Sequence, residues 1–450
     1  MNDLLRRNFA ETHPGMTPKE AMDESNRCLY CYDAPCITAC PTGIDIPAFI
    51  KKISTGNLKG SARTIMDANP VGATCSRVCP TEQLCEGACV LNDASQPIRI
   101  GLLQRYATDA ARKSGERLFA PGPSNGRCVA VVGSGPAGLS AARELARFGY
   151  AVTVYEAKEK PGGLDTYGIV AFRLPQEIAL WEAEQLTKMG VSIRTGVRVG
   201  VDVAPETLLA EFDAVVLAVG MGRVPGLGIE GEELEGVYDA IELIESTKTG
   251  AFAGDFAGAR VAVIGAGNTA IDAATCAGRL GASDVKIVYR RTRSEMTAYA
   301  FEYKFAKEEG VEFRWLTAPK RIVGDAAGKA THLECVKMSL SGGVVGKDGR
   351  PVPAPIEGSE FLMEADVVIK AIGQTRLTPL IEAFGLEHVR GVVKIDPDTY
   401  RTSRPKVYAA GDVVFGQGAG EATVVSAAQQ GKLAAHAIHR ELAAAAAETA

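Results

Sequence analysis

Eight of the eleven cysteines in this 450-residue chain lie between Cys28 and Cys89. They form two runs, Cys28-x2-Cys31-x4-Cys36-x3-Cys40-Pro41 and Cys75-x3-Cys79-Pro80-x4-Cys85-x3-Cys89. This clustering constrains the fold strongly, because the chain must bring many thiols to a few common points. In a reducing compartment, closely spaced thiols are more often metal or redox ligands than a disulfide framework.

Both runs contain the dipeptide Cys-Pro. Short thiolate spacings that end in Cys-Pro are typical of ferredoxin-type segments, and in two-cluster versions the last cysteine of a run serves the other cluster. Two zinc sites of four thiolates each are the alternative, although zinc pairs are usually separated by two residues in both halves of the site. The spacing therefore favours two [4Fe-4S] clusters and leaves zinc open.

The overall composition is that of an ordinary globular protein, with 46% apolar and 23% charged residues. Its 49 Lys and Arg against 54 Asp and Glu give a net charge of -5, so there is no basic footprint for nucleic acid. The sequence shows neither a signal-peptide core nor an uninterrupted apolar run of about 18 residues. We expect a cytoplasmic protein of two or three domains with no nucleic-acid or membrane partner.

The segment 128–156 has the pattern of a strand, a glycine turn, a helix and a second strand that Glu156 closes. In the turn, Gly133 permits the tight bend, Gly135 lets a pyrophosphate approach the helix N-terminus, and Gly138 lets helix and strand pack closely. Glu156 can accept hydrogen bonds from ribose hydroxyls. This context makes a dinucleotide site the expected function of the motif.

A second unit of the same pattern begins at Arg260, with the turn Gly-Ala-Gly-Asn-Thr-Ala at 265–270. Where the first unit has Glu156, the second has Arg290 and Arg291 after its strand. A carboxylate would suit the 2'-hydroxyl of NAD, whereas arginine binds phosphate oxygens. The pattern predicts a nicotinamide cofactor and favours NADPH over NADH; two solvated arginines at a strand end are the alternative.

Near the C-terminus, the segment 407–411 has the pattern of a short strand that runs into Asp412, a glycine-rich loop and a helix from about Glu421. In flavoproteins with two dinucleotide domains, such an aspartate binds the ribityl chain of the flavin. We therefore assign FAD to the first unit and the nicotinamide cofactor to the second. The segment 161–168 contains no cysteine, which argues against thiol chemistry at the flavin.

The order of these segments predicts an α/β fold with a helical iron-sulfur domain followed by two Rossmann-like dinucleotide-binding domains, the second inserted in the first. Helices are expected near 47–55, 58–69 and 101–113. Two similar apolar strands, at 214–220 and 366–373, suggest the points where the chain crosses between the two dinucleotide domains. The expected limits are 1–120 for the cluster domain, 127–255 with 367–445 for the FAD domain, and 256–366 for the NAD(P) domain.

With these features assembled, the chain resembles the glutamate synthase small-subunit family of FAD and iron-sulfur oxidoreductases. Within that family it is most similar to the N-terminal half of dihydropyrimidine dehydrogenase and to the separate bacterial subunit that corresponds to this half. The resemblance spans about residues 20–440. It is strongest at residues 27–36, 69–75, 78–81, 98–105 and 172–175.

This resemblance changes the assignment of the cluster ligands. The family pattern implies an unusual glutamine ligand, which falls on Gln104, and Cys75 would then be a spare thiol. The implied sets are Cys28, Cys31, Cys36 and Cys89 for one cluster, and Cys40, Cys79, Cys85 and Gln104 for the other. Because a neutral amide donates less charge than a thiolate, the second cluster should have a shifted reduction potential.

The resemblance also implies which residues contact the two nucleotides. The implied FAD contacts are Gly133, Ser134, Gly135, Pro136, Ala137, Gly138, Glu156, Gly163, Leu164, Arg173, Val199, Asp412, Thr423 and Val424. The implied nicotinamide contacts are Ala266, Gly267, Asn268, Thr269, Arg290, Arg291, Ala371, Ile372 and Gly373. The bacterial two-subunit enzymes are associated with NADH, whereas the two arginines argue for NADPH, and we give the local chemistry slightly more weight.

The function that the resemblance implies is electron input to dihydropyrimidine dehydrogenase. A nicotinamide hydride would reduce FAD, and the two clusters would relay electrons to a separate FMN and iron-sulfur subunit that reduces uracil or thymine. The predicted domains leave no segment for FMN and pyrimidine, so we expect a hetero-oligomer. The alternatives are a glutamate synthase small subunit, a ferredoxin:NADP oxidoreductase subunit, and a non-catalytic FAD- and zinc-binding assembly module.

Overall fold

The computed structural model describes residues 7–340, 343, 345–346, 349–416 and 422–449, and the chain divides into two compact units. The larger unit consists of His13–Thr166, Arg173–Met221 and Arg376–Ala450. The smaller unit consists of Met1–Thr12, Tyr167–Phe172 and Gly222–Thr375. Within the described ranges, none of the helices combines the length and the apolar composition needed to cross a membrane.

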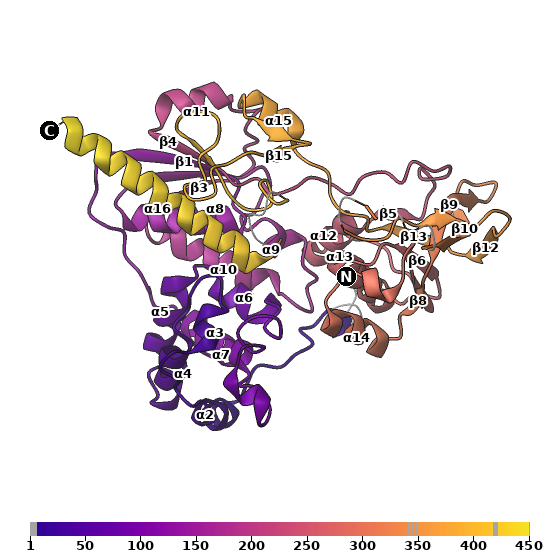
Figure 1. Ribbon diagram of the computed structural model, residues 1–450, viewed down its shortest axis with the longest axis horizontal. Helices are drawn as coiled ribbons and strands as arrows, with labels where there is room; N and C mark the ends of the chain where they lie inside the picture. The colour runs from indigo at the N-terminus through magenta and orange to yellow at the C-terminus, as the bar shows by residue number, and fades with distance from the viewer. Residues whose placement is uncertain (1–6, 341–342, 344, 347–348, 417–421, 450) are drawn as a thin grey trace. The chain divides into compact units, whose positions relative to one another are not determined.

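The first part of the larger unit is helical, as predicted. Its elements are α2 (Pro18–Asn26), α3 (Pro35–Thr38), α4 (Ile46–Ser54), α5 (Leu58–Ala68), α6 (Gly72–Val78), the 3-10 helix η1 (Val90–Asp93) and α7 (Ile100–Ser114). Figure 1 shows them gathered at one end of this unit. They pack around a core that includes the fully buried Phe49, Ile50, Ile65 and Leu103. This core holds the cysteine-bearing loops in place between the helices.

The second part of the larger unit is a five-stranded parallel sheet in the order β16-β4-β1-β2-β3. Its strands are β1 (Cys128–Val132), β2 (Ala151–Tyr155), β3 (Ser192–Arg194), β4 (Ala214–Leu217) and β16 (Val407–Ala409), and β14 (His388–Val389) pairs separately with β15 (Val392–Val393). Its helices are α8 (Pro136–Arg147), α10 (Gln176–Thr187), α11 (Pro205–Glu211), α15 (Thr378–Ala383) and α16 (Val424–Thr449), while α9 (Leu164–Tyr167) ends at the boundary of the unit. The valine-rich β1 and β4 are buried almost throughout, as central parallel strands are.

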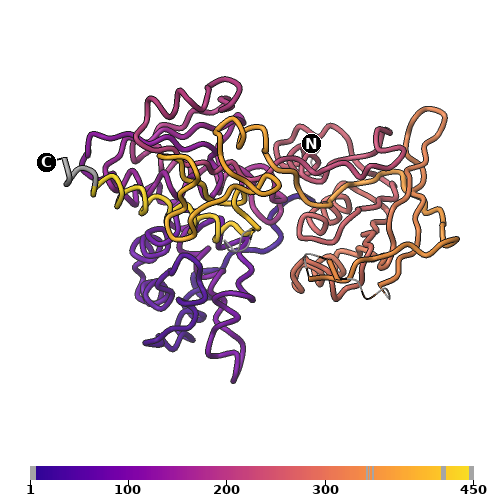
Figure 2. Tube along the Cα trace, turned by 45° about the horizontal axis from the view of Figure 1, so that its top comes forward, coloured from indigo at the N-terminus to yellow at the C-terminus, as the bar shows by residue number. Residues whose placement is uncertain are grey.

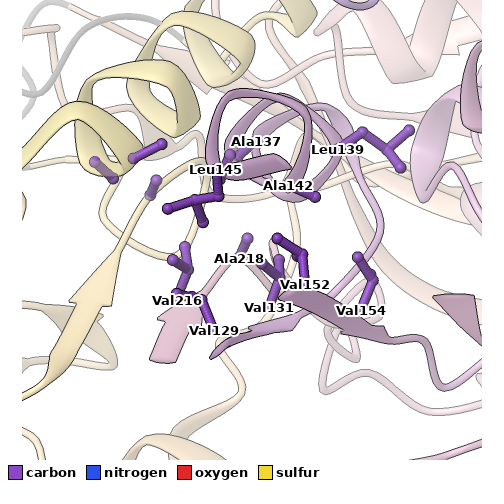
Figure 3. Close-up of a cluster of buried hydrophobic side chains, with 14 of the residues drawn as sticks. Val129, Val131, Ala137, Leu139, Ala142, Leu145, Val152, Val154, Val216 and Ala218 are labelled. Atoms are coloured by element: carbon purple, nitrogen blue, oxygen red, sulfur yellow. The ribbon is translucent and has the colours of Figure 1, made fainter. Parts of the chain in front are cut away.

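Helix α8 covers one face of this sheet. Figure 3 shows Leu145 and Ala142 of the helix directed toward Val129 and Val131 of β1. The long α16 lies against α8, and Figure 2 shows this C-terminal stretch, in yellow, beside segments from the first half of the chain. The approach is close, since a Cβ added at Gly431 would lie 2.0 Å from Ala137 O.

The smaller unit contains a second parallel sheet, in the order β5-β13-β6-β7-β8. Its strands are β5 (Val237–Asp239), β6 (Arg260–Ile264), β7 (Asp284–Val288), β8 (Glu312–Arg314) and β13 (Val367–Lys370). Its helices are α12 (Ala240–Thr249), α13 (Asn268–Arg279), the 3-10 helix η2 (Arg293–Glu295) and α14 (Ala300–Glu308). Each sheet places its glycine-motif strand, β1 or β6, at the centre, so the internal repeat predicted from the two motifs is present in the fold.

The repeat extends to one hydrogen bond at the start of each central strand. Asp213 accepts from Cys128 N at 2.8 Å, and Asp366 accepts from Arg260 N at 2.9 Å. In both sheets this aspartate immediately precedes the strand beside the central one. The Arg260 guanidinium also binds Asp366 and lowers the pKa of that carboxyl to about 2.

Two features of the smaller unit differ from the sequence expectation. Strand β13 pairs with β6 inside the second sheet, and the chain passes to the larger unit only after Thr375. We therefore propose 222–375 as the main limits of the NAD(P) domain. The unit also contains an antiparallel sheet that the glycine motifs did not predict. Its strands are β9 (Thr317–Gly324), β10 (Ala330–Ser339), β11 (Ala354–Pro355) and β12 (Phe361–Glu364).

Candidate cluster and nucleotide sites

Four of the clustered thiols line one cavity in the helical part of the larger unit. They belong to Cys28, Cys31, Cys36 and Cys89, the set predicted for the first cluster. The wall is otherwise largely apolar, and burial raises the pKa of the Cys36 thiol to about 11. Such a thiol stays protonated at neutral pH unless a nearby cation favours the thiolate, and a coordinating metal supplies that charge.

A second cavity nearby is lined by the other predicted set, Cys40, Cys79, Cys85 and Gln104. Burial raises the pKa of the Cys85 thiol well above its usual range, and it also raises the pKa of the Cys28 and Cys36 thiols in the first cavity. Ile46 lines both cavities, so the two ligand sets lie on either side of one side chain. The thiols thus lie around two cavities, with Cys75 beside the second set, and the assignment of ligands to each cluster stays a prediction.

Gln104 lies on α7 with 7% of its surface exposed. Its Nε2 donates to Gly72 O at 2.7 Å, and no described residue donates to its Oε1, which leaves the oxygen for a ligand. Cys75, on α6, lines the same cavity. Its thiol has a pKa well above the usual range because of a hydrogen bond with Cys79 and because of burial. The assignment of Gln104 as a ligand and of Cys75 as a spare thiol stays a prediction.

The spacing of these side chains bears on the kind of metal group. A single zinc ion would need four sulfurs at about 2.3 Å. In the part of the chain that the structure describes, no three Cys, His, Asp or Glu side chains come together around one such point. The thiols line two cavities, and sets of thiolate donors are the ligands that iron-sulfur clusters use.

The first glycine turn has the geometry that the motif predicts. Gly133 has φ +99°, and a Cβ there would lie 2.4 Å from Ala218 O. A Cβ at Gly138 would lie 1.9 Å from Gly133 O, so neither position admits a side chain. Gly135 caps α8 without a side-chain hydrogen bond, and Pro136 follows it. The free amides of this helix N-terminus suit a pyrophosphate.

Glu156 lies just after β2, with 8% of its surface exposed. One carboxylate oxygen accepts from Ser134 N at 3.1 Å and Ser134 Oγ at 2.5 Å, and the other accepts from Lys158 N at 2.8 Å. Ser134 Oγ also accepts from Gly162 N at 3.0 Å. A Cβ at Gly163 would lie 2.8 Å from Gly135 Cα, so the predicted Gly163–Leu164 contact lies beside the turn.

Asp412 follows β16 and is half-buried. Burial raises the pKa of its carboxyl group, and Arg376, which donates to Asp412 O at 2.6 Å, opposes that shift. The preceding Gly411 brings this segment to α8, because a Cβ there would lie 3.0 Å from Ala137 Cβ. Residues 417–421, with most of the predicted glycine-rich loop and Glu421, are outside the described ranges.

The remaining predicted FAD contacts differ in their placement. Thr423 and Val424 lie at the start of α16, where Thr423 Oγ1 accepts from Ser426 N at 3.2 Å. Arg173 is half-buried. Val199 is buried in the same core cluster as Tyr155 and Leu208, which gives it a packing role beside the end of β2. The turn, Gly163 and Asp412 therefore form the centre of the candidate flavin site, at the carboxyl ends of β1 and β4, where the strand order reverses.

The second glycine turn lies beside the end of β13. Gly265 has φ +126°, and a Cβ there would lie 2.1 Å from Ala371 O. Ala371 N donates to Ile264 O at 2.8 Å, and Asn268 Oδ1 accepts from Tyr299 N at 3.2 Å. The structure therefore brings together the two predicted nicotinamide segments, which are Ala266, Gly267, Asn268 and Thr269 in one and Ala371, Ile372 and Gly373 in the other.

The two arginines after β7 have different surroundings. Arg290 is exposed, whereas Arg291 has 5% of its surface exposed and its Nε donates to Pro351 O at 2.9 Å. A 2'-phosphate needs an accessible guanidinium. We therefore propose that Arg290 is the phosphate-binding residue of the pair and that Arg291 fixes the segment around Pro351.

Two family models match the chain. Residues 127–437 match the model described as pyridine nucleotide-disulphide oxidoreductase, and residues 5–116 match the model described as dihydropyrimidine dehydrogenase domain II, 4Fe-4S cluster. The chain belongs to the pyridine nucleotide-disulphide oxidoreductase family. Its N-terminal match is to an iron-sulfur domain, which decides against the zinc alternative.

Several relatives of this oxidoreductase are named as subunits or chains of dehydrogenases and of glutamate synthase. It is 38% identical over 435 residues to the NAD-dependent dihydropyrimidine dehydrogenase subunit PreT of Escherichia coli K12, covering 96% of this chain and 97% of that protein. It is 34% identical over 452 residues to the glutamate synthase [NADPH] small chain of Azospirillum brasilense, covering 96% and 92%. It is 36% identical over 433 residues to the NADP(+)-dependent formate dehydrogenase subunit beta of Moorella thermoacetica, where it covers 91% of this chain but 60% of that protein.

Among solved structures, the oxidoreductase is similar to thioredoxin reductase from T. acidophilum, with a TM-score of 0.54 and 25% identity over 70% of this chain and 99% of that chain. The family resemblance and the α/β fold class predicted from the cysteine and glycine motifs are therefore confirmed.

The sequence analysis missed a buried carboxylate that joins the flavin half of the larger unit to its cluster half. Glu182, on α10, accepts from Ala73 N at 2.7 Å, from Thr74 N at 3.0 Å and from Thr74 Oγ1 at 2.5 Å. It caps the N-terminus of α6, where the helix dipole favours negative charge. Burial raises the pKa of this carboxyl to about 7, and the hydrogen bonds oppose that shift.

Two cationic side chains bind the C-terminus of α5, in contrast to Glu182, which binds the N-terminus of α6. Arg143, on α8, donates to Met66 O and Asp67 O at 2.5 and 2.7 Å. Lys432, on α16, donates to Ala68 O at 3.0 Å. These carbonyls lie at the C-terminus of α5, where the dipole favours positive charge. We call Arg143, Glu182 and Lys432 the charge clamp; no local sequence pattern marks it, because its partners are distant in the chain.

Proposed function

We propose that this oxidoreductase is the electron-input subunit of a dihydropyrimidine dehydrogenase. One observation carries the electron-input role: the second cluster cavity is lined both by Cys40 and Cys79 and by Val425 of α16. The choice of dihydropyrimidine dehydrogenase rests on the similarity to the PreT subunit. Val425 directly follows Val424, a proposed FAD contact at the start of that helix. The same helix would therefore separate the flavin from the second cluster by very few atoms.

The proposed cofactors are FAD, NADP(H) or NAD(H), and two [4Fe-4S] clusters. When bound, the flavin can accept two electrons as a hydride and release them one at a time, and iron-sulfur clusters carry single electrons. The chain supplies binding and orientation: the turn at Gly133–Gly138 would hold FAD, and the turn at 265–270 with Arg290 would hold the nicotinamide cofactor. The shared wall residue Ile46 supports a relay between the two clusters.

The charge clamp supports this route in a second way. Arg143, Glu182 and Lys432 bind backbone groups at the ends of α5 and α6, the helices on either side of the segment 69–71. Buried charges of this kind fix geometry, because removing one leaves its partner unpaired. The clamp would therefore hold the second cluster at a constant distance from the flavin, as single-electron transfer between fixed centres requires.

The proposed final acceptor lies on another chain. By its name, the PreT relative is a subunit, and we propose a comparable partner here: an FMN and iron-sulfur subunit, PreA-like, that reduces uracil or thymine to 5,6-dihydropyrimidine. The test mixes the purified chain with a purified PreA-like FMN and iron-sulfur subunit and follows uracil-dependent NAD(P)H oxidation. We expect turnover only when both chains are present, and uracil-dependent turnover by this chain alone would refute the division of labour.

The second candidate function is that of a glutamate synthase small subunit, favoured by the 34% identity over 92% of that relative. Both functions use the same electron-input machinery and differ in the partner. Adding 2-oxoglutarate and glutamine in place of uracil distinguishes them, because only a glutamate synthase complex would then oxidise NAD(P)H and form glutamate.

A further inference from the structure

Asn69 is a fully buried amide in the wall of the second cluster cavity. It follows α5 in an extended conformation, as expected for the residue before a proline. Its backbone N–H donates to Ile65 O at 3.0 Å, and its backbone carbonyl accepts from Gly72 N at 3.1 Å. The backbone of Asn69 is therefore fully hydrogen-bonded, and its side chain remains for other partners.

Val71 fixes the orientation of this side chain. Asn69 Oδ1 accepts from Val71 N at 3.1 Å, a bond that the amide nitrogen could not make. Nδ2 must then point away from Val71, and it meets no ordinary hydrogen-bond acceptor among the described groups; its remaining interaction is with the Cys75 thiol, whose pKa it lowers. Buried donors without an acceptor are costly and rare, so a group held in the cavity is the expected acceptor.

Sulfur is the acceptor that this cavity offers. The hydroxyl of Thr42 lies 3.4 Å from Cys40 Sγ, so one polar group is already placed against a predicted ligand sulfur. The hydrogen bond with Cys79 and burial raise the pKa of the Cys75 thiol, and Asn69 lowers that pKa. The Asn69 amide is therefore within electrostatic reach of sulfur in the same cavity.

We propose that Asn69 Nδ2 donates a hydrogen bond to a sulfur of the second cluster and raises the reduction potential of that cluster. The inference rests on the second cluster of the proposed function. Hydrogen bonds to the sulfurs help to set cluster potentials, and a donor stabilises the reduced cluster more because it carries one more negative charge.

The test compares Asn69→Ser with Asn69→Leu in anaerobic EPR redox titrations of the intact holoprotein. Serine can still accept from Val71 N, and its hydroxyl ends one atom short of the position of Nδ2, whereas leucine offers neither an acceptor nor a donor. We expect both variants to lower the equilibrium constant for reducing the second cluster at least about tenfold, or about 59 mV for one electron. The first cluster is the internal control and should not shift. A wild-type potential in the leucine variant overturns the proposal, because leucine has no group that could donate to the sulfur.

If a variant does not assemble its second cluster, a measurement on the wild-type chain tests whether Asn69 contacts that cluster. Asn69 is the one asparagine among the residues found to line this cavity. In protein labelled with 15N in asparagine alone, pulsed EPR of the reduced second cluster should detect a 15N coupling. A second cluster without that coupling overturns this inference only, whereas a holoprotein without a second cluster contradicts the proposed function as well.

Discussion

Gln104 is the residue at which the predicted cluster chemistry departs from four thiolates. We expect Gln104→Cys to change the EPR spectrum of the second cluster and to lower its potential, because a thiolate adds negative charge that a neutral amide does not. EPR redox titration of the anaerobic holoprotein measures both effects. Cys75→Ala is the matched control from the same cavity and should leave iron content and spectrum unchanged. If Cys75→Ala lost iron while Gln104→Cys kept the wild-type EPR spectrum and potential, Cys75 and not Gln104 would be the ligand.

Arg290 and Arg291 look equivalent in the sequence, and only the structure separates them by burial. We expect Arg290→Ala to lower kcat/KM for NADPH about ten- to hundredfold, the value of one or two hydrogen bonds to a charged group, with little change for NADH. Steady-state kinetics with both coenzymes and an artificial acceptor measure this. If the wild type prefers NADH and Arg290→Ala leaves kcat/KM unchanged for both coenzymes, Arg290 does not bind a 2'-phosphate.

At the scale of elements, the glycine motifs predicted β1, α8, β2 and their repeat, because each motif is local and its strands are buried on both faces. The antiparallel sheet of β9 to β12 was missed, since its strands carry no motif and their partners follow from tertiary pairing. The charge clamp was missed for a related reason. Glu182 and Thr74 are 108 residues apart, and a carboxylate on a helix is ordinarily expected to face solvent.

The first glycine turn offers a matched pair of substitutions within one element. We expect Gly138→Ala to destabilise the fold, because its Cβ would lie 1.9 Å from Gly133 O. Gly135→Ala meets no atom within 4 Å, so the fold should persist while the methyl group blocks the pyrophosphate and weakens FAD binding. Thermal unfolding and flavin titration measure the two effects separately. Tight FAD binding by Gly135→Ala would remove the turn from the proposed site.

Glu182 makes the junction between α10 and α6 sensitive to pH. Its pKa is about 7 in the folded chain against about 4.5 in the unfolded chain, because burial disfavours the ionised form. Its contribution to stability is therefore complete below pH about 4.5 and is lost as the pH rises through about 7. Between pH 5 and 8 we expect the thermal midpoint of Glu182→Gln to rise relative to wild type. The exposed Glu184→Gln, on the same helix, is the control; parallel pH curves for Glu182→Gln and wild type would contradict the assignment.

At the scale of the whole molecule, one chain combines an iron-sulfur domain with a pyridine-nucleotide oxidoreductase domain. Family membership supports both domains. The similar relatives act in pyrimidine, glutamate and formate enzymes, so the shared part is the electron-input machinery and the partner is expected to decide the product. In the proposed function, electrons would pass from the flavin turn to the second cavity and then to the first.

The most direct test of this account is an anaerobic titration of the purified holoprotein with NADPH, or with NADH if that coenzyme is preferred, followed by absorbance and EPR together. The account predicts that the flavin is reduced and that signals from two distinct reduced [4Fe-4S] clusters appear, and that uracil added to this chain alone does not reoxidise them. Flavin reduction without any reduced-cluster signal, or reoxidation by uracil with no partner present, would contradict it.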